Sequence, residues 1–309
     1  MTPSLQTYRR APGGSALILV LWCLLLLGMA VFSVIQMVEL SVEHTTHLEH
    51  VQDARALASS GIALGLNSQL LKDDPLLNQT NSVGGVFRVT IGSEGARLNI
   101  NHVLANNHRQ ILVNLFQQWG LRPVDADHAA DCLYDWVTPG SLKSLNGAKA
   151  DDYARAGLPQ TPSGEPFVSL DEVASVMGMD AVEKAHPTWR DSFTLWSSGP
   201  LDVNEAPPEL IAAVFGLDPS RVTFMTDARN GKDGIVGTSD DVPVPDTKTF
   251  QAELGLDDTT MKAYGGEIAL KDTVRRVESV GQVEGTQVMI SVVTPLKASP
   301  IQYFLWSEQ

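Results

Sequence analysis

The chain has 309 residues and a mass of 33.4 kDa, with 43% hydrophobic and 19% charged residues. This length exceeds one typical domain and the composition excludes wholesale disorder, so we expect two globular units behind an anchor. The net charge of −14 argues against a nucleic-acid partner, because an acidic surface repels phosphate. Cys23 lies in an apolar run and cannot reach Cys132, so neither a structural disulfide nor a cysteine-based metal site is expected.

Residues 16–38 form an almost uninterrupted apolar run, ALILVLWCLLLLGMAVFSVIQMV. A helix of this length crosses a hydrocarbon core of roughly 30 Å. Arg9 and Arg10 precede the run, so the positive-inside rule leaves the N-terminus in the cytoplasm and everything after Val38 outside. The run is too long for a signal peptide and no A-x-A-like cleavage site follows it. We therefore expect a transmembrane helix over residues 15–38, for which an ordinary signal anchor stays an alternative.

The residues before this run resemble the leader of type IV pilin-like proteins. In that class a prepilin peptidase cuts after a glycine directly before the apolar helix, and here the stretch is RRAPGGSALILVLW. The resemblance implies that residues 1–14 are a leader, removed by cleavage between Gly14 and Ser15, with Ser15 a candidate for N-methylation. Cleavage after Gly13 stays open. Most pilins carry Glu at the fifth mature position, where this chain has Leu19, and the resemblance implies a tip subunit with no subunit above it.

The helix continues beyond the membrane with small residues on one face, at Val51, Ala54, Ala58, Gly61 and Gly65. Spacings of three and four residues place them on one side of an α-helix. Small side chains permit close approach of a sheet or another helix. This is the arrangement of a pilin scaffold, although a core helix of any α+β protein fits it equally well.

Strand patterns occur on both sides of a long helical block. VFRVTI and ARLNIN predict strands within residues 39–101, which also hold the second half of the long helix. Residues 271–309 predict more strands, with a β-hairpin turning at Glu284-Gly285. Residues 102–270 read mainly helical and suggest two subdomains, about 102–196 and 197–270. The expected fold class is α+β: a pilin-like fold, with a long N-terminal transmembrane helix on an antiparallel sheet, carrying a large all-α insertion domain.

Four motifs in order resemble the general secretion pathway protein K family, the large minor pseudopilin of type II secretion systems. They are ARLNINHVLANNHRQILVNLF, LYDWVTPGSLKSLNGAKADDY, FVSLDEVASVMGM and LDVNEAPPELIAAVFGL. The resemblance implies a minor pseudopilin at the pseudopilus tip, with assembly-initiating or capping and export roles. It implies a tip complex with I- and J-type minor pseudopilins, processing by prepilin peptidase, and an inner-membrane anchor with a periplasmic head.

The same motifs can also be explained by residues that begin, cap and end helices. Asn204 or Glu205 can start a helix whose first turn tolerates two prolines. Ser169 with Glu172 forms a capping box, and Gly178 is a natural C′ residue. Asp135 and Trp136, at the end of a helix, are expected to be architectural. The glycine turns carry acids, which argues against a helix-hairpin-helix module for DNA.

An acidic, glycine-rich loop is the best candidate for site chemistry, DARNGKDGIVGTSDDVPVPD at 227–246. Hard oxygen ligands on a kinked loop suit Ca²⁺, which accepts irregular geometry. We expect Asp233, Asp240 and Asp241 as ligands, completed by backbone carbonyls. The spacing does not match an EF-hand, and a solvated acidic loop is the alternative. The resembled family includes calcium-binding members.

No enzyme motif stands out: G-x-S-x-G, H-E-x-x-H and P-loop sequences do not occur. His44, His47 and His50 share a helical neighbourhood, for which a polar helix face is the simpler explanation. We therefore expect a structural subunit without catalytic residues. A membrane-anchored periplasmic binding protein or enzyme with a pilin-like anchor is the alternative.

Overall fold

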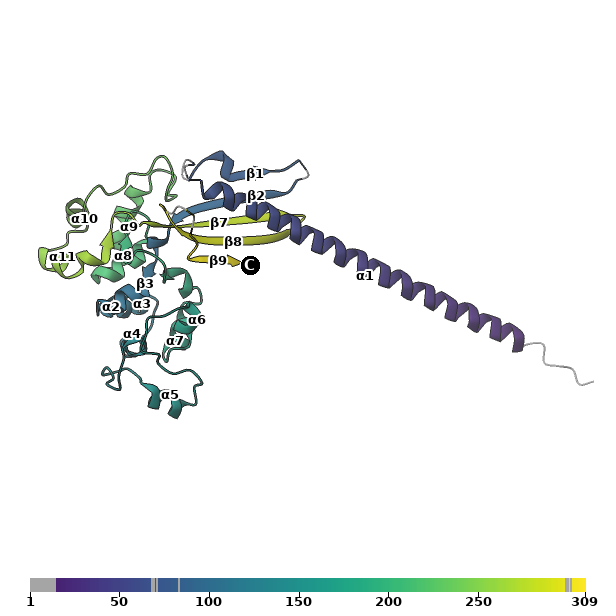
Figure 1. Cartoon of the computed structure of the whole chain (residues 1–309), viewed down its shortest axis with the longest axis horizontal. Coiled ribbons are helices and arrows are strands. Elements are labelled where there is room, and N and C mark those ends of the chain that lie inside the picture. Colours follow the sequence, from purple (N-terminus) through teal and green to yellow (C-terminus); the bar gives the residue numbers. More distant parts are fainter. Residues whose placement is uncertain (1–14, 68–69, 71, 83, 298–299, 301) are drawn as a thin grey trace, which may run out of the picture.

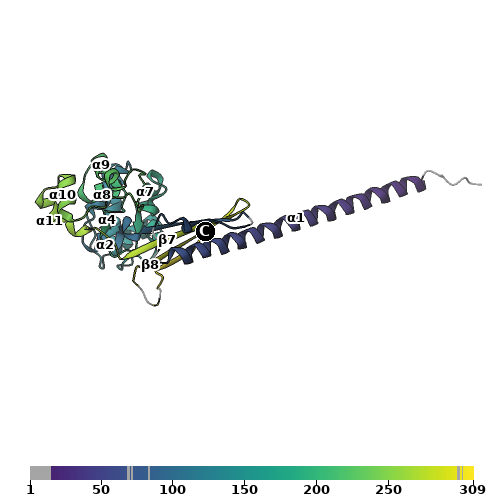
Figure 2. The ribbon, with the colours of Figure 1, turned by 90° about the horizontal axis from the view of Figure 1, so that it is seen from above.

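The structure, a computed structural model, describes residues 15–309 except 68–69, 71, 83, 298–299 and 301. Its first element is α1 (Ser15–Gly65), a continuous helix of 51 residues and therefore about 77 Å long. The N-terminal part of α1 projects from the head as a rod, and its C-terminal part lies on a sheet (Figures 1 and 2). The expected leader, including Gly14, lies outside the described residues.

The scaffold sheet has five strands in the order β1-β2-β7-β8-β9, and each neighbouring pair is antiparallel. The strands are β1 (Asn78–Thr80), β2 (Val86–Ser93), β7 (Val274–Val283), β8 (Thr286–Pro295) and β9 (Leu305–Glu308). The predicted hairpin is confirmed: β7 and β8 join through Glu284 and Gly285 at φ +47° and +84°, values typical of a type I′ turn. A long helix lying on an antiparallel sheet is a pilin-like fold.

The small-residue stripe of α1 lies against this sheet, as predicted. Ala54 and Ala58 are fully buried over β7 and β8. A Cβ atom on Gly61 would come within 2.2 Å of the Ser279 Oγ, and one on Gly281 within 1.9 Å of the Ala54 carbonyl oxygen. The helix therefore touches β7 almost backbone to backbone, and only glycine fits at the contact.

A large insertion separates Ser93, the end of β2, from Val274, the start of β7. Its helices are α2 (Ile100–Ala105), α3 (Gln110–Gln118), α4 (Pro123–Val137), α5 (Ala150–Ala156), α6 (Leu170–Ala174), α7 (Met179–Ala185), α8 (Pro208–Phe215), α9 (Pro219–Arg229), α10 (Thr247–Leu254) and α11 (Asp258–Tyr264). In Figure 1 they gather at the end of the sheet away from the free part of α1. The insertion is thus mainly helical.

The insertion is not entirely helical, which corrects the all-α expectation. Two short parallel strand pairs close its two halves. They are β3 (Leu98–Asn99) with β4 (Phe193–Thr194), and β5 (Leu201–Asp202) with β6 (Ile268–Ala269). The ARLNIN strand predicted for the scaffold is therefore only β3, which pairs with β4 outside the five-stranded sheet.

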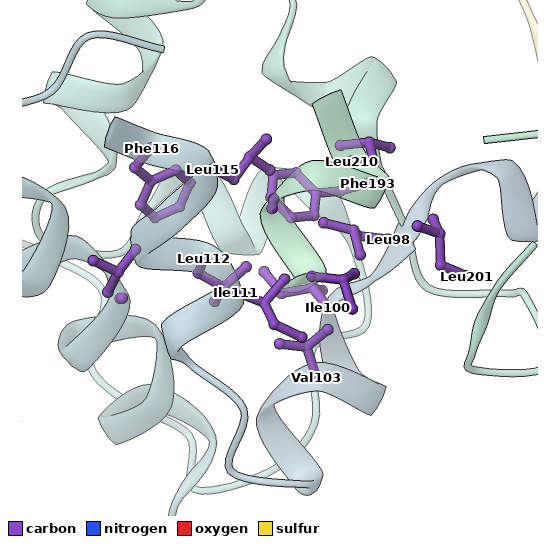
Figure 3. Packing of buried hydrophobic residues seen from close by; sticks show 14 of the residues in the cluster. Leu98, Ile100, Val103, Ile111, Leu112, Leu115, Phe116, Phe193, Leu201 and Leu210 are labelled. Atoms are coloured by element: carbon purple, nitrogen blue, oxygen red, sulfur yellow. The ribbon is translucent and has the colours of Figure 1, made fainter. Parts of the chain in front are cut away.

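The two halves of the insertion share one hydrophobic core. Phe116 and Phe193 from the first half belong to the same buried cluster as Leu210 and Phe250 from the second; Figure 3 shows the packing around Leu210 and Phe193. Asn114 of α3 donates a hydrogen bond to the carbonyl oxygen of Ala213 in α8 at 2.8 Å. The halves are one packed body, whereas α1 and the sheet hold a second, separate core.

Candidate functional site

The acidic loop between α9 and α10 brings together the three acids predicted from the sequence. One carboxylate oxygen from each of Asp233, Asp240 and Asp241 lies within 4.8 Å of the other two. The other acids of the loop region serve elsewhere. Asp227 is exposed on α9, and Asp246 caps α10 by accepting a hydrogen bond from the Thr249 N–H at 2.8 Å.

Hydrogen bonds within the loop hold these carboxylates. Asp240 accepts from the Lys232 N–H at 2.6 Å and from the Thr238 hydroxyl at 2.8 Å, and these donors hold its pKa below the ordinary value. Asp241 accepts from the Gly237 N–H at 2.5 Å. Gly231 makes room for the cluster, since a Cβ there would lie 2.5 Å from an Asp240 carboxylate oxygen. The loop therefore gathers carboxylate oxygen donors of the kind that a hard cation takes.

Asn204 fixes the base of the loop to the rest of the insertion. Its side-chain oxygen accepts from the Val244 N–H at 2.7 Å. Its amide donates to the Val244 carbonyl at 3.2 Å and to the Leu270 carbonyl at 2.9 Å. The prediction that Asn204 starts a helix is wrong, because Pro207 is the N-cap of α8.

The neighbouring Glu205 does not start a helix either, but joins the insertion to the scaffold. Its carboxylate accepts from the Ser93 N–H, at the end of β2, at 2.7 Å. It also pairs with the Lys72 ammonium, in the segment after α1, at 2.5 Å. The LDVNEAPP motif is thus a connector between the loop and the sheet, a role that its local sequence pattern does not reveal.

A buried ion pair forms a second connection between insertion and scaffold. Glu94, in the 3₁₀ turn that follows β2, has no exposed surface. It accepts two hydrogen bonds from the Arg276 guanidinium of β7, at 2.7 and 2.9 Å. It also accepts from the Thr194 hydroxyl of β4. One carboxylate therefore joins the first turn of the insertion, a strand of its first half, and the central strand of the scaffold.

A cavity of about 360 Å³ lies between these connections and the acidic loop. Lys72 and Arg275 line its scaffold side, while Thr238 of the loop and Asp202 line the opposite side. Burial raises the pKa of Asp202 above its ordinary value. The cavity carries groups of both charges, with Lys72 and Arg275 facing Asp202 and Glu205 among its lining residues.

Asp135 is architectural, as predicted. It is almost fully buried and accepts hydrogen bonds from the Ser144 N–H and hydroxyl, both at 2.9 Å. Gly147 packs against it so closely that a Cβ would lie 1.9 Å from its carboxylate. Lys149 donates to the Asp135 and Thr138 carbonyls, each at 2.6 Å. These contacts fix the loop after α4.

Trp136 and its partner Glu172 are architectural as well. The Trp136 indole donates to Glu172 at 2.8 Å, and Ser169 caps α6 by accepting from the Glu172 N–H at 3.1 Å. In the predicted capping box the Glu172 carboxylate would accept from the Ser169 N–H. It accepts instead from the Val168 N–H. Gly178 is the N-cap of α7, not the C′ residue of α6, because α6 ends at Ala174.

The predicted mature N-terminus and fifth mature position lie in the first turns of α1. Ser15 is its first residue, and Leu19 lies exposed within it. Leu17–Glu39 is the one candidate membrane span among the described residues, with a mean hydropathy of 2.8 and none of its most apolar window buried. A single N-terminal membrane anchor fits this segment.

Comparisons with known proteins converge on one family. A family model described as type II secretion system (T2SS), protein K, matches residues 96–186, the first half of the insertion. The crystal structure of the GspK-GspI-GspJ complex from the type 2 secretion system of enterotoxigenic Escherichia coli contains a chain with the same fold, at a TM-score of 0.61 and 16% identity. The match covers 88% of this chain and 99% of that chain. No curated protein sequence matches. Residues 96–186 therefore resemble protein K of the type II secretion system, and the chain shares the fold of a chain in the GspK-GspI-GspJ complex.

Proposed function

We propose that the chain is a minor pseudopilin at the tip of a type II secretion pseudopilus. The main support is that residues 96–186 match the family model for protein K and lie in an insertion carried by a pilin-like scaffold. In this proposal residues 15–38 cross the inner membrane with the N-terminus in the cytoplasm. The head lies in the periplasm, next to I- and J-type minor pseudopilins. The protein acts through assembly and has no catalytic role.

Two features support the tip position. The insertion adds a broad body at the end of the sheet farthest from the free part of α1 (Figure 1). A subunit stacked above would meet this body before it reached the scaffold. Leu19 stands where pilins carry a membrane-embedded Glu, so α1 offers no carboxylate to the amine of a subunit above it. Both features favour a cap over a filament-body subunit.

Coexpression of the full chain with the I- and J-type minor pseudopilins and the prepilin peptidase of the same secretion system tests the proposal. We expect all three minor pseudopilins to purify together from detergent-solubilised membranes. Mass spectrometry is expected to find Ser15 as a methylated N-terminus. An intact Met1 in the presence of the peptidase, without a complex, would instead favour the alternative of an anchored periplasmic binding protein or enzyme.

We further propose that the acidic loop binds Ca²⁺ through Asp233, Asp240 and Asp241. The support is their convergence within 4.8 Å, the oxygen-only donor set and the lowered pKa of Asp240. The bound ion would offset most of the repulsion among the three carboxylates and fix the loop that lines the 360 Å³ cavity.

Calorimetric titration of the full chain with Ca²⁺ tests this second proposal. The wild type and the control Asp227→Asn, altered on α9, should release or absorb heat and gain thermal stability. The double variant Asp240→Asn/Asp241→Asn should do neither. Equal binding by all three proteins would place the ion elsewhere, and no heat with the wild type would exclude Ca²⁺ binding.

A further inference from the structure

The outer edge of β9 is an unpaired strand edge. In the part of the chain that the structure describes, β9 pairs with β8 on one side and with no strand on the other. Met289 and Gln309 exchange two backbone hydrogen bonds of 2.9 Å. This pair shows which residues of β9 direct their backbone groups toward β8. In an antiparallel pair the hydrogen-bonded positions alternate, so the N–H and C=O groups of Trp306 and Glu308 point away from β8. These four groups are placed to receive another strand.

Aromatic side chains gather at the same edge. Tyr303, Phe304 and Trp306 are each about half exposed, at 48%, 47% and 49%. Tyr303 and Trp306 meet edge to face, with ring centroids 5.5 Å apart. Outside the membrane span, Phe224 on α9 is the other large aromatic that is exposed among the described residues. Tyr and Trp concentrate where proteins bind one another, so this cluster marks an interface.

The position of β9 selects the kind of partner. Arg55 of α1 pairs with Glu308 at 2.8 Å, so the end of β9 is fixed to the helix. Arg55 follows the end of the candidate span, Glu39, by 16 residues, which places this contact about 24 Å outside the membrane. A neighbour anchored in the same membrane by a similar helix presents its own head at this height. A soluble partner would have no such constraint.

We infer that β9 receives an extended strand from the head of a neighbouring membrane-anchored pseudopilin, which continues the sheet and packs on Tyr303 and Trp306. The inference rests on the proposed function and names the surface that the tip complex uses. Backbone hydrogen bonds supply affinity in such strand addition, and the aromatic pair supplies specificity.

Crosslinking in the assembled complex tests the partner. A photoreactive phenylalanine analogue replaces Trp306 in the full chain, coexpressed with the I- and J-type minor pseudopilins, and a second variant carries it at Phe224. We expect a crosslink to one of the two minor pseudopilins from position 306 and none from 224. A crosslink to a second copy of this chain or to an exported protein would overturn the choice of partner.

A matched pair at one position tests the strand addition itself. Glu308→Pro removes an outward N–H without touching the ladder to β8, and Glu308→Ala removes only the ion pair with Arg55. We expect the proline variant to lower recovery of the complex about tenfold and the alanine variant to leave it unchanged. A wild-type complex that forms with neither crosslink nor proline effect overturns this inference alone. Absence of any complex overturns the proposed function with it.

Discussion

At the scale of single residues, the contact between α1 and β7 depends on glycines from both elements. The helical stripe predicts small residues on α1, and the structure confirms that Ala54 and Gly61 face the sheet. The matching glycine on β7, Gly281, was not predicted. An isolated glycine in a strand indicates a close approach but does not identify what approaches.

Gly281→Ala is expected to destabilise the scaffold by about 1–3 kcal/mol or more, since the new methyl group would meet the Ala54 carbonyl at 1.9 Å. Backbone atoms on both sides cannot move aside as a flexible side chain can. Urea unfolding of the detergent-solubilised chain measures the change. Gly266→Ala is the matched control, because no atom lies within 4 Å of its added Cβ. Equal midpoints for the two variants would contradict the close contact.

At the residue level, the sequence could group side chains whose positions lie close along the chain. Asp233, Asp240 and Asp241 fall within nine residues of one another, so composition and glycine spacing sufficed to group them. Prediction failed for Asn204 and Glu205, because a polar residue before Pro-Pro reads as a helix start. Their true partners lie 40 to 133 residues away, and no local pattern specifies such contacts.

At the scale of elements, the Glu94–Arg276 pair joins the insertion to β7. Removing one member of a buried ion pair leaves an uncompensated charge, at a cost of about 3–5 kcal/mol. Arg276→Met is therefore expected to destabilise the protein by about this amount. Glu94→Gln should cost less, because Arg276 keeps Glu278 at 3.5 Å.

Urea unfolding of both single variants and of Glu94→Gln/Arg276→Met measures this coupling. The double variant is the control, and it should be more stable than Arg276→Met alone, since no buried charge is then left unpaired. Strictly additive losses would show that the two residues act separately.

The strands divide into those that local pattern predicts and those that it does not. The hairpin of β7 and β8 has alternating residues around a turn that requires positive φ, so it was predicted correctly. The two-residue strands β4, β5 and β6 were missed, and β3 was predicted only as part of a longer strand of the scaffold. Their pairing joins segments about 70 to 100 residues apart, and two residues carry no periodicity. The same distance explains why the insertion was expected to be all-α and to consist of two separate subdomains.

At the scale of the whole molecule, the two hydrophobic cores do not mix. The core under α1 holds residues of α1, β2, β7 and β8 and the turn before β1, whereas the other core lies within the insertion. Ser93 and Arg275 are Cα partners across β2 and β7, so the insertion leaves and re-enters the scaffold at adjacent points. A short turn can therefore connect β2 directly to β7 in place of the insertion.

Replacing residues 94–273 with a four-residue turn built on Asn-Gly is expected to leave a folded scaffold. Its core is retained whole, and Arg276 becomes exposed to water when Glu94 is removed. Far-UV circular dichroism and protease resistance in detergent measure this. The comparison variant deletes only residues 100–192. It removes half of a shared core and uncovers Leu210 and Ile211, so it should aggregate or be degraded. A stable half-deletion beside an unfolded scaffold would contradict the division into two cores. If the scaffold folds, the proposed capping role can be tested with it: we expect longer pseudopili at an unchanged level of anchored protein.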